Sequence, residues 1–351
     1  MSVAVLRDCR IEPYDLAFMS PWRSARGQTD RRRGYLFLIG DEDGGTGIGE
    51  CAPLPMAGTE DANAALAWLR AAATALEGRD AMACLASFEP DSGHPAASCA
   101  VECALLDLVS ARAGHPLREW LVKDAGDTCH VNASLGALDA GTVGRAERAV
   151  AAGFEILKIK LATAPPSTER SALAALAATL PFGASLRLDA NGAWTQDEAL
   201  VWLRALEGLP IESLEEPLRA PSSVGLRQLQ ARCDFPLALD ESLPELLRSG
   251  LPSTLPVARV VLKPMVLGGA RRTLAIAGAL EERGGECVVT TTLEAAPGRW
   301  LVAHCAAALG NALAHGLDTG DWLVSDLGPG PPLTDGCCRL PSQPGLGYRR
   351  A

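Results

Sequence analysis

The segment Glu155-Ile156-Leu157-Lys158-Ile159-Lys160 is apolar but carries two lysines two positions apart. Residues two apart on a β-strand point to the same face, so the segment predicts a strand that directs both ammonium groups into one space. Two inward lysines are costly unless carboxylates or an anionic substrate lie opposite them. We therefore expect acidic side chains elsewhere in the chain to complete one site around Lys158 and Lys160.

Three acidic residues further along the chain meet this requirement, because each lies at or near the end of an apolar segment. They are Asp189, Glu215 and Asp240, and a third lysine, Lys263, follows the apolar run Val260–Leu262. The carboxyl ends of parallel strands form one rim of a barrel, and the chemistry of such barrels lies at that rim. Oxygen ligands are typical of Mg²⁺, whereas zinc is disfavoured because no histidine or cysteine clusters with this set. The sequence thus predicts a magnesium site formed by these three acids.

A second glutamate, Glu216, directly follows Glu215. Adjacent residues on a strand face opposite sides, so only one of the two can point into the barrel. We expect Glu215 to enter the site and Glu216 to point away from it.

Apolar segments recur at regular intervals from about residue 129 onward, with helical runs between them. The candidate strands fall near Val131, Leu157, Leu186, Ile211, Leu237, Val260, Val288 and Leu317. Alternating strands and helices over this length favour parallel strands with crossover helices, and eight repeats favour a closed α/β barrel over an open sheet.

The first third of the chain has a different pattern, with short candidate strands followed by two helices. Strands that precede helices suggest an α+β domain. We predict that this domain covers residues 1–125 and the barrel residues 126–319. The proline-rich segment 320–351 is expected to pack back on the first domain.

The composition argues against several classes of protein. With a formal net charge of -10 and no basic face, the 351-residue chain is not expected to bind nucleic acid. Its eleven cysteines form no C-x-x-C pair, which suits reduced thiols. The start of the chain lacks the features of a signal peptide, and no charge-free run reaches transmembrane length. We expect a cytoplasmic enzyme with a small carboxylate substrate, no membrane association, and an oligomeric state that the sequence leaves open.

Five short motifs together resemble the enolase superfamily, in its muconate-lactonising branch. They are Lys158-x-Lys160, Asp189-x-Asn191, Glu215-Glu216-Pro217, Asp240-Glu241-Ser242 and Lys263. The resemblance implies a modified TIM barrel of the (β/α)7β type with an α+β capping domain. It also implies Mg²⁺ as cofactor and abstraction of a proton next to a carboxylate.

Within this branch the chain is most similar to the o-succinylbenzoate synthases. The similarity rests on Gly47–Pro55, Arg187–Trp194 and Gly316–Thr319. It implies dehydration of 2-succinyl-6-hydroxy-2,4-cyclohexadiene-1-carboxylate to o-succinylbenzoate, a lyase reaction of menaquinone biosynthesis.

The resemblance also implies roles for individual residues. Lys160 would be the base, Lys158 would help hold the substrate carboxylate, and Lys263 would face the substrate from the other side. Three further residues would support the metal ligands or contact the substrate, namely Arg187, Asn191 and Glu241.

Other functions stay open at this point. N-succinylamino acid racemases and dipeptide epimerases of the same superfamily need two lysines on opposite faces, and this chain has both. Dipeptide epimerases usually carry an Asp-x-Asp pair late in the barrel, and the spacing in Asp318-Thr319-Gly320-Asp321 differs from it. A Schiff-base aldolase would leave the three acids unexplained, and a barrel that only binds would not need a full catalytic set.

Two connections of the first domain are predicted to form a flexible lid over the site. They cover Met19–Arg33 and Pro53–Glu60 and are rich in Gly, Pro and Ser. The basic run Arg31-Arg32-Arg33 is expected to be a solvated loop or, alternatively, a part of the lid that attracts an anionic substrate.

Overall fold

A parallel, curled sheet forms one half of the molecule. The computed structural model describes residues 4–24, 27–248 and 250–350. The seven strands of this sheet follow one another in sequence order: β5 (Ala133–Ala137), β6 (Ile156–Lys160), β7 (Ser185–Asp189), β8 (Ile211–Glu215), β9 (Leu237–Leu239), β10 (Arg259–Leu262) and β11 (Glu286–Val289). The predicted barrel strands from Leu157 to Val288 are therefore confirmed, and the fold is a modified TIM barrel with a capping domain.

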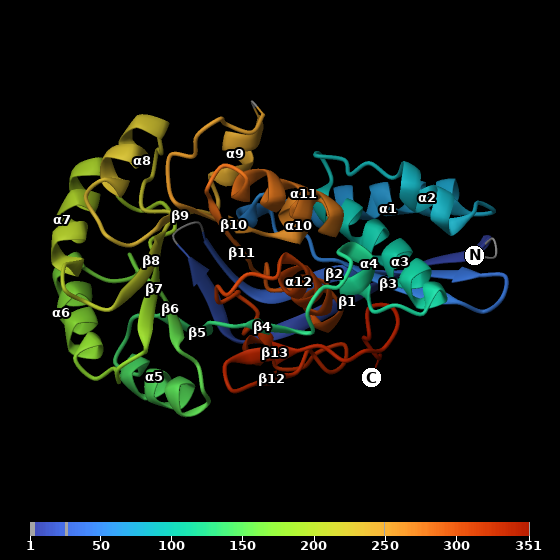
Figure 1. The fold of residues 1–351 in the computed structure, drawn as a ribbon. Coiled ribbons are helices and arrows are strands. Elements are labelled where there is room, and N and C mark those ends of the chain that lie inside the picture. The colour runs from blue at the N-terminus through green and yellow to red at the C-terminus, as the bar shows by residue number, and fades with distance from the viewer. Residues whose placement is uncertain (1–3, 25–26, 249, 351) are drawn as a thin grey trace.

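Helices cover the outside of this sheet (Figure 1). They are α5 (Thr142–Ala151), α6 (Pro166–Ala177), α7 (Gln196–Leu206), α8 (Ser223–Gln230), α9 (Leu243–Arg248), α10 (Pro264–Leu267), α11 (Ala270–Glu281) and α12 (Ala296–Leu309). Leucines of the strands and helices, such as Leu157, Leu188, Leu203 and Leu280, are buried together in one apolar cluster. None of the helices in the described ranges is long and apolar enough to cross a membrane.

The prediction of an eighth strand near Leu317 is wrong. The chain instead closes the barrel through two isolated bridges, from His315 to Val131 and from Gly316 to Thr290. The approach at Gly316 is so close that a Cβ atom there would lie 2.0 Å from the Thr290 Oγ1. His315 is buried, and its Nδ1 accepts a hydrogen bond from the Val289 N–H at 3.0 Å. The seam therefore pairs through a few backbone hydrogen bonds at His315 and Gly316, too short a stretch to form a strand, and the His315 side chain adds one further bond.

The capping domain combines one antiparallel sheet with a group of helices. The sheet contains β1 (Leu6–Ser24), β2 (Gly27–Asp41) and β3 (Thr46–Cys51), and the helices are α1 (Ala62–Leu76), α2 (Ala81–Ser87), α3 (Pro95–Ala113) and α4 (Leu117–Leu121), with a 3-10 turn η1 (Pro55–Ala57) between sheet and helices. Helix α3 is buried along most of its length because β3 packs directly against it. A Cβ at Gly49 would lie 1.9 Å from the Ala100 carbonyl oxygen, so glycine permits this contact.

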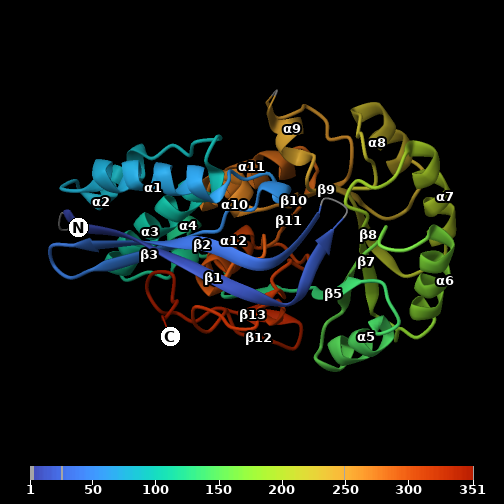
Figure 2. The same cartoon turned by 180° about the vertical axis from the view of Figure 1, so that it is seen from behind.

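The segment Met19–Arg33, predicted as a loop, is largely β-strand. Strands β1 and β2 pair as one long hairpin that reaches from the capping domain to the barrel (Figure 2). Phe18 forms a bridge to Leu323, which docks the hairpin on the barrel side. Residues 25–26 of the predicted lid lie outside the described residues. The other predicted lid segment, Pro53–Glu60, contains η1.

The C-terminal part of the chain lies against both halves. It contains a 3-10 turn η2 (Gly320–Trp322) and two short strands, β12 (Leu333–Thr334) and β13 (Cys337–Arg339), which form a small sheet with β4 (Thr128–His130). Leu340 and Leu346 are buried in the same apolar cluster as residues of α3 and α12. The exact division into residues 1–125 and 126–319 stays a prediction.

A buried histidine joins α12 to the C-terminal segment. His304 Nδ1 accepts the Arg118 N–H at 3.0 Å, and Nε2 lies 2.9 Å from the Leu346 carbonyl oxygen. Burial, helped by the nearby Arg118 charge, lowers the pKa of His304 to about 4. The unfolded chain therefore binds a proton here more readily than the folded chain as the pH falls below about 6.5.

This histidine predicts a loss of stability in mild acid. As the pH falls from about 7 to 5, His304 should lower the free energy of unfolding by roughly 2 kcal/mol, because this residue becomes protonated over this interval in the unfolded state alone. The variant His304→Asn should be less stable near neutrality but should lose roughly 2 kcal/mol less than the wild type over this interval. Urea unfolding at both pH values measures the difference, and equal losses in the two proteins would contradict the prediction.

Candidate active site

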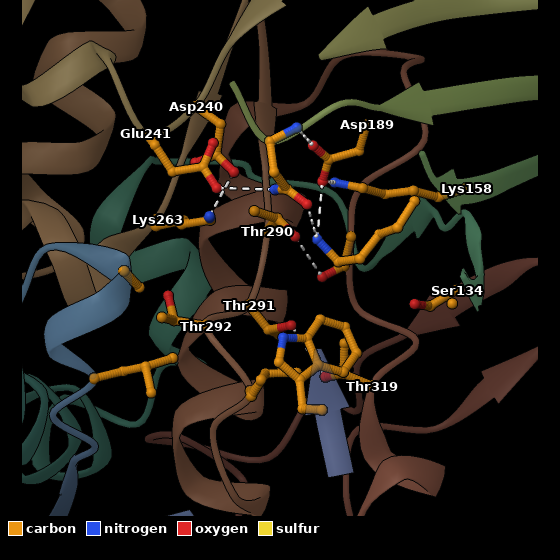
Figure 3. Close-up of a pocket in the computed structure, with 18 of the residues that line it drawn as sticks. Ser134, Lys158, Asp189, Asp240, Glu241, Lys263, Thr290, Thr291, Thr292 and Thr319 are labelled. Atoms are coloured by element: carbon orange, nitrogen blue, oxygen red, sulfur yellow. Dashed lines mark hydrogen bonds and ion pairs between the residues drawn. The ribbon is translucent and has the colours of Figure 1, made fainter. Parts of the chain in front are cut away.

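The candidate active site lies at the carboxyl ends of the barrel strands, beneath the far end of the capping hairpin. The pocket is lined from the barrel by lysines, acids and hydroxyl side chains, and from the capping domain by Trp22, Leu54 and Met56. Figure 3 shows Lys158 and Lys263 on opposite sides of this pocket. The hairpin and η1 thus close a site whose polar groups come from the barrel.

The two lysines of β6 enter the site together, as their spacing predicts. Lys158 Nζ contacts the Glu215 carboxylate and lies 3.4 Å from Asp189 Oδ2. Lys160 Nζ lies 3.2 Å from the same Asp189 oxygen and donates to Asn191 Oδ1 at 2.8 Å. Burial alone would lower the pKa of Lys158, but the charges of Glu215 and Asp189 outweigh it and raise that pKa.

The three predicted metal ligands end neighbouring strands. Asp189 and Glu215 are the last residues of β7 and β8, and Asp240 directly follows β9. All three are buried, with exposed fractions of 1%, 1% and 5%. Burial alone would raise the pKa of Asp189, but the surrounding lysines lower it, so the carboxylate stays ionised.

Lys263 completes the set from the opposite side of the barrel. It follows β10, and its Nζ donates to Asp240 Oδ2 at 2.5 Å. Burial would lower the pKa of Lys263, but Asp240 and Glu241 raise it. Each inward lysine is therefore matched by carboxylates.

Asn191 connects both sides of this cluster. Its backbone N–H donates to Asp189 Oδ1, and its side-chain Nδ2 donates to Glu241 Oε1, both at 3.0 Å. Its φ of 47° is left-handed, a conformation that asparagine tolerates better than most residues. Asn191 and Glu241, both predicted as supports, are thus brought to the site by the structure. The second oxygen of Glu241 is buried, and no described residue forms a hydrogen bond with it.

Arg187, predicted to support the metal ligands or to contact the substrate, is not itself among the residues that line the pocket, and its role stays a prediction. It faces the barrel interior two residues before Asp189, which places it about 7 Å deeper along β7. Its guanidinium pairs with Glu212 at 2.9 Å and donates to Asn132 Oδ1 at 3.1 Å. Because Asn132 lines the pocket, Arg187 is connected to the site through that side chain.

Glu216 has a role that strand alternation could not reveal. The residue has a left-handed φ of 40°, so it no longer follows the strand. Its Oε2 accepts the backbone N–H groups of Asp240 at 2.9 Å and Ser242 at 3.2 Å. Burial raises the pKa of Glu216 to about 7. Glu216 points away from the pocket, as predicted, but it braces the loop that carries Asp240.

Several pocket residues were not predicted individually. A wall of hydroxyl groups comes from Ser134, Thr290, Thr291, Thr292 and Thr319. Ser134 lies within β5, the three threonines 290–292 directly follow β11, and Thr319 lies in the closing segment. The Thr-Thr-Thr run was the available sequence signal for three of the five. Trp22 of the hairpin places its ring 5.3 Å from Lys160 Nζ.

The donor set fits a hard divalent cation. In the described parts of the chain, no three His, Cys, Asp or Glu side chains are yet close enough to share one ion. The ammonium group of Lys158 lies between Asp189 and Glu215, so a cation already occupies the space between two of the acids. Three buried carboxylates on neighbouring strand ends are oxygen ligands of the kind that Mg²⁺ prefers.

Comparison with known proteins places this site in a family. A model of the enolase C-terminal domain-like family matches residues 141–350, more than half of the chain. The chain belongs to the enolase superfamily. The superfamily enzyme is 31% identical to the o-succinylbenzoate synthase of Thermosynechococcus vestitus, over 66% of this chain and 67% of that protein. It is 29% identical to the L-Ala-D/L-Glu epimerase of Bacillus subtilis, over 73% of this chain and 71% of that protein.

Solved structures of the superfamily share the whole architecture. The dipeptide epimerase of Enterococcus faecalis, complexed with Mg and the dipeptide L-Leu-L-Tyr, has a TM-score of 0.86 at 25% identity and covers 98% of this chain and 99% of its own. The muconate lactonizing enzyme of Pseudomonas fluorescens has the same TM-score at 24% identity, covers 100% of this chain and 98% of its own, and supports the fold alone. The relatives differ in their named activities, so they show the superfamily but not the reaction of this enzyme.

Proposed function

We propose that the enzyme is an o-succinylbenzoate synthase, which dehydrates 2-succinyl-6-hydroxy-2,4-cyclohexadiene-1-carboxylate in menaquinone biosynthesis. The observation that carries this proposal is the lining of the pocket. Three lysines and a wall of hydroxyl groups face a space that an indole ring closes from above. Such a lining suits a flat, cyclic substrate with two carboxylates, because the cations and hydroxyl groups bind the anionic groups and the ring packs against Trp22.

The proposed reaction assigns one main task to Lys160. Its Nζ, in the uncharged form, takes the proton from the carbon next to the ring carboxylate. The electron pair of that C–H bond forms the new ring double bond as the C–O bond to the hydroxyl group breaks. The leaving hydroxide takes a proton from the same Lys160, so one water is released and the lysine is restored.

The remaining charged groups hold the substrate. Lys158 binds the ring carboxylate, and Lys263 provides a cation beside the ring on the opposite side. Asp189, Glu215 and Asp240 are the residues that would hold Mg²⁺. When bound there, the ion would supply positive charge beside the substrate carboxylate and make the neighbouring C–H more acidic.

A second candidate function is the epimerisation of dipeptides. Two observations favour it: Lys160 and Lys263 approach from different strands, and Asp318 lines the pocket. A carboxylate at this place could bind the ammonium group of a dipeptide. However, the Asp318 Oδ2 already accepts the Ser134 N–H at 3.0 Å. Of the described pocket-lining residues, Asp318 is the one acid outside the cluster of lysines, metal ligands and Glu241.

The variant Asp318→Asn separates the two functions, because it removes a charge but keeps an oxygen that can accept the Ser134 N–H. For a dianionic substrate we expect dehydration to stay within about threefold of the wild type. For a dipeptide, loss of the counter-charge should lower kcat/KM by roughly 100-fold or more. Dehydration followed by ultraviolet absorbance of the aromatic product is the test. A wild type that shows no dehydration would refute the proposed function.

A further inference from the structure

The basic run Arg31-Arg32-Arg33 is split between two faces of β2. Arg31 and Arg33 are exposed and both pair with Asp15 on the neighbouring strand. Arg32 points the other way and is buried, with 1% of its surface exposed. The expectation that the whole run is solvated or attracts substrate is therefore wrong for Arg32, because strand alternation turns it into the interior.

The buried guanidinium joins segments that are far apart in sequence. Arg32 Nη1 donates to the Pro53 carbonyl oxygen at 2.7 Å, and Nη2 contacts the Ala52 carbonyl oxygen. On the other side, Nε donates to the Leu293 carbonyl oxygen at 2.9 Å. Nη2 also approaches the Thr292 carbonyl oxygen at 3.5 Å. One side chain thus ties β2 to the segment after β3 and to the segment after β11.

These three segments are the walls of the pocket. The hairpin that contains β2 carries Trp22, the segment after Pro53 begins with Leu54, and Thr292 and Leu293 lie on the barrel side. Arg32 itself does not line the pocket. Its planar group contacts the backbone behind each wall, so it acts through these segments and not on the substrate.

One of the contacts holds a strained residue. Leu293 has a left-handed φ of 62°, which is unfavourable for a leucine, and its side chain is buried at the pocket wall. The hydrogen bond from Arg32 fixes the carbonyl of this residue. Without that bond, we expect the backbone to relax to a negative φ, which would move the Leu293 side chain.

Two buried acids, Glu50 and Glu294, lie near this cation. Glu50 on β3 accepts Ala295 N–H and Gly298 N–H at the start of α12, each at 2.8 Å. Glu294 is fully buried next to Leu293. Burial raises the pKa of both carboxyl groups, and the positive charge of Arg32 acts in the opposite direction on each pKa. The Arg32 guanidinium, with its carbonyl partners on two segments, is therefore part of the packed interior of the protein and not a surface group.

We propose that Arg32 is a positioning residue that sets the shape of the substrate pocket, by holding Ala52–Pro53 and Thr292–Leu293 against the capping hairpin. Lysine cannot replace it, because one ammonium group cannot reach carbonyl oxygens on both sides of the planar guanidinium. The effect on catalysis rests on the proposed function, whereas the effect on the pocket walls does not.

The first test measures the walls without any substrate. Hydrogen exchange of Arg32→Lys, followed by mass spectrometry, should show faster exchange in residues 52–58 and 290–294 than in the wild type, with the barrel strands unchanged. Arg33→Lys is the matched control, since Arg33 is adjacent but exposed, and it should exchange like the wild type. Unchanged exchange in Arg32→Lys would overturn the proposal, whatever the protein catalyses.

The second test measures the reaction. Arg32→Lys should raise KM for the dehydration substrate by roughly tenfold or more and change kcat much less, because the lysines that act on the substrate stay in place. In Arg32→Ala, added ethylguanidinium should restore part of the lost affinity by filling the vacated space. Equal KM values in Arg32→Lys and Arg33→Lys would refute the positioning role. A wild type without dehydratase activity would refute the proposed function and leave the exchange result to decide on Arg32.

Discussion

Replacing Lys160 by Ala is expected to lower kcat for dehydration by roughly 10²–10⁴-fold, because the proposed reaction uses this lysine both to take the proton and to return it to the leaving hydroxide. The same variant should no longer exchange the α-proton of a saturated carboxylate analogue of the substrate with deuterium from solvent. Proton NMR in deuterated water with Mg²⁺ present measures this exchange separately from turnover.

Lys263→Ala is the matched comparison. Both lysines are partly buried at the site, and each contacts an acid: Lys160 contacts Asp189, and Lys263 contacts Asp240. Lys263→Ala should also impair dehydration, because a cation beside the ring is lost, but α-proton exchange should persist. If exchange is instead lost in Lys263→Ala and kept in Lys160→Ala, the roles of the two lysines are reversed.

The second large effect is expected at Glu215. Glu215→Gln removes a buried negative charge that would hold Mg²⁺ and that contacts Lys158. We expect kcat/KM to fall by roughly three orders of magnitude or more, and Mg²⁺ binding measured by calorimetry to weaken strongly.

Glu216→Gln is the adjacent control with the same chemical change. Its side-chain oxygen can still accept the N–H groups of Asp240 and Ser242, so the brace is preserved. Activity and Mg²⁺ affinity should fall by about tenfold at most. A stronger loss at Glu216 than at Glu215 would show that the ligand assignment is wrong by one residue.

The barrel was predictable because its strands are buried apolar segments that end in charged residues. The two-residue spacing of Lys158 and Lys160 directs both into one site. Strands β7 and β8 end at Asp189 and Glu215, and Lys263 directly follows the end of β10. These relations depend only on the period of a strand and on the shared rim of a parallel barrel.

The alternation of side chains along a strand does not show how deep in the barrel a residue lies, how the chain turns after the strand, or which distant segments pack together. Arg187 shares a face with Asp189 but lies deeper, and alternation cannot tell these positions apart. Glu216 leaves the strand through a left-handed residue, after which the alternation no longer applies. Arg32 looks like its exposed neighbours in the sequence, and only the packing of the hairpin against residues 52–53 and 292–293 shows its role. The closing segment pairs with its neighbours only at the isolated bridges of His315 and Gly316, and the apolar pattern near Leu317 does not show how short this pairing is.

The most direct test of the proposed function compares two reactions of the wild-type enzyme in one Mg²⁺ buffer. One is the dehydration of 2-succinyl-6-hydroxy-2,4-cyclohexadiene-1-carboxylate, and the other is the racemisation of N-succinylamino acids, each measured as kcat/KM. We predict that dehydration is faster by at least about two orders of magnitude. Rapid racemisation of N-succinylamino acids with little dehydration would contradict the assignment, although the chain would remain a member of the enolase superfamily.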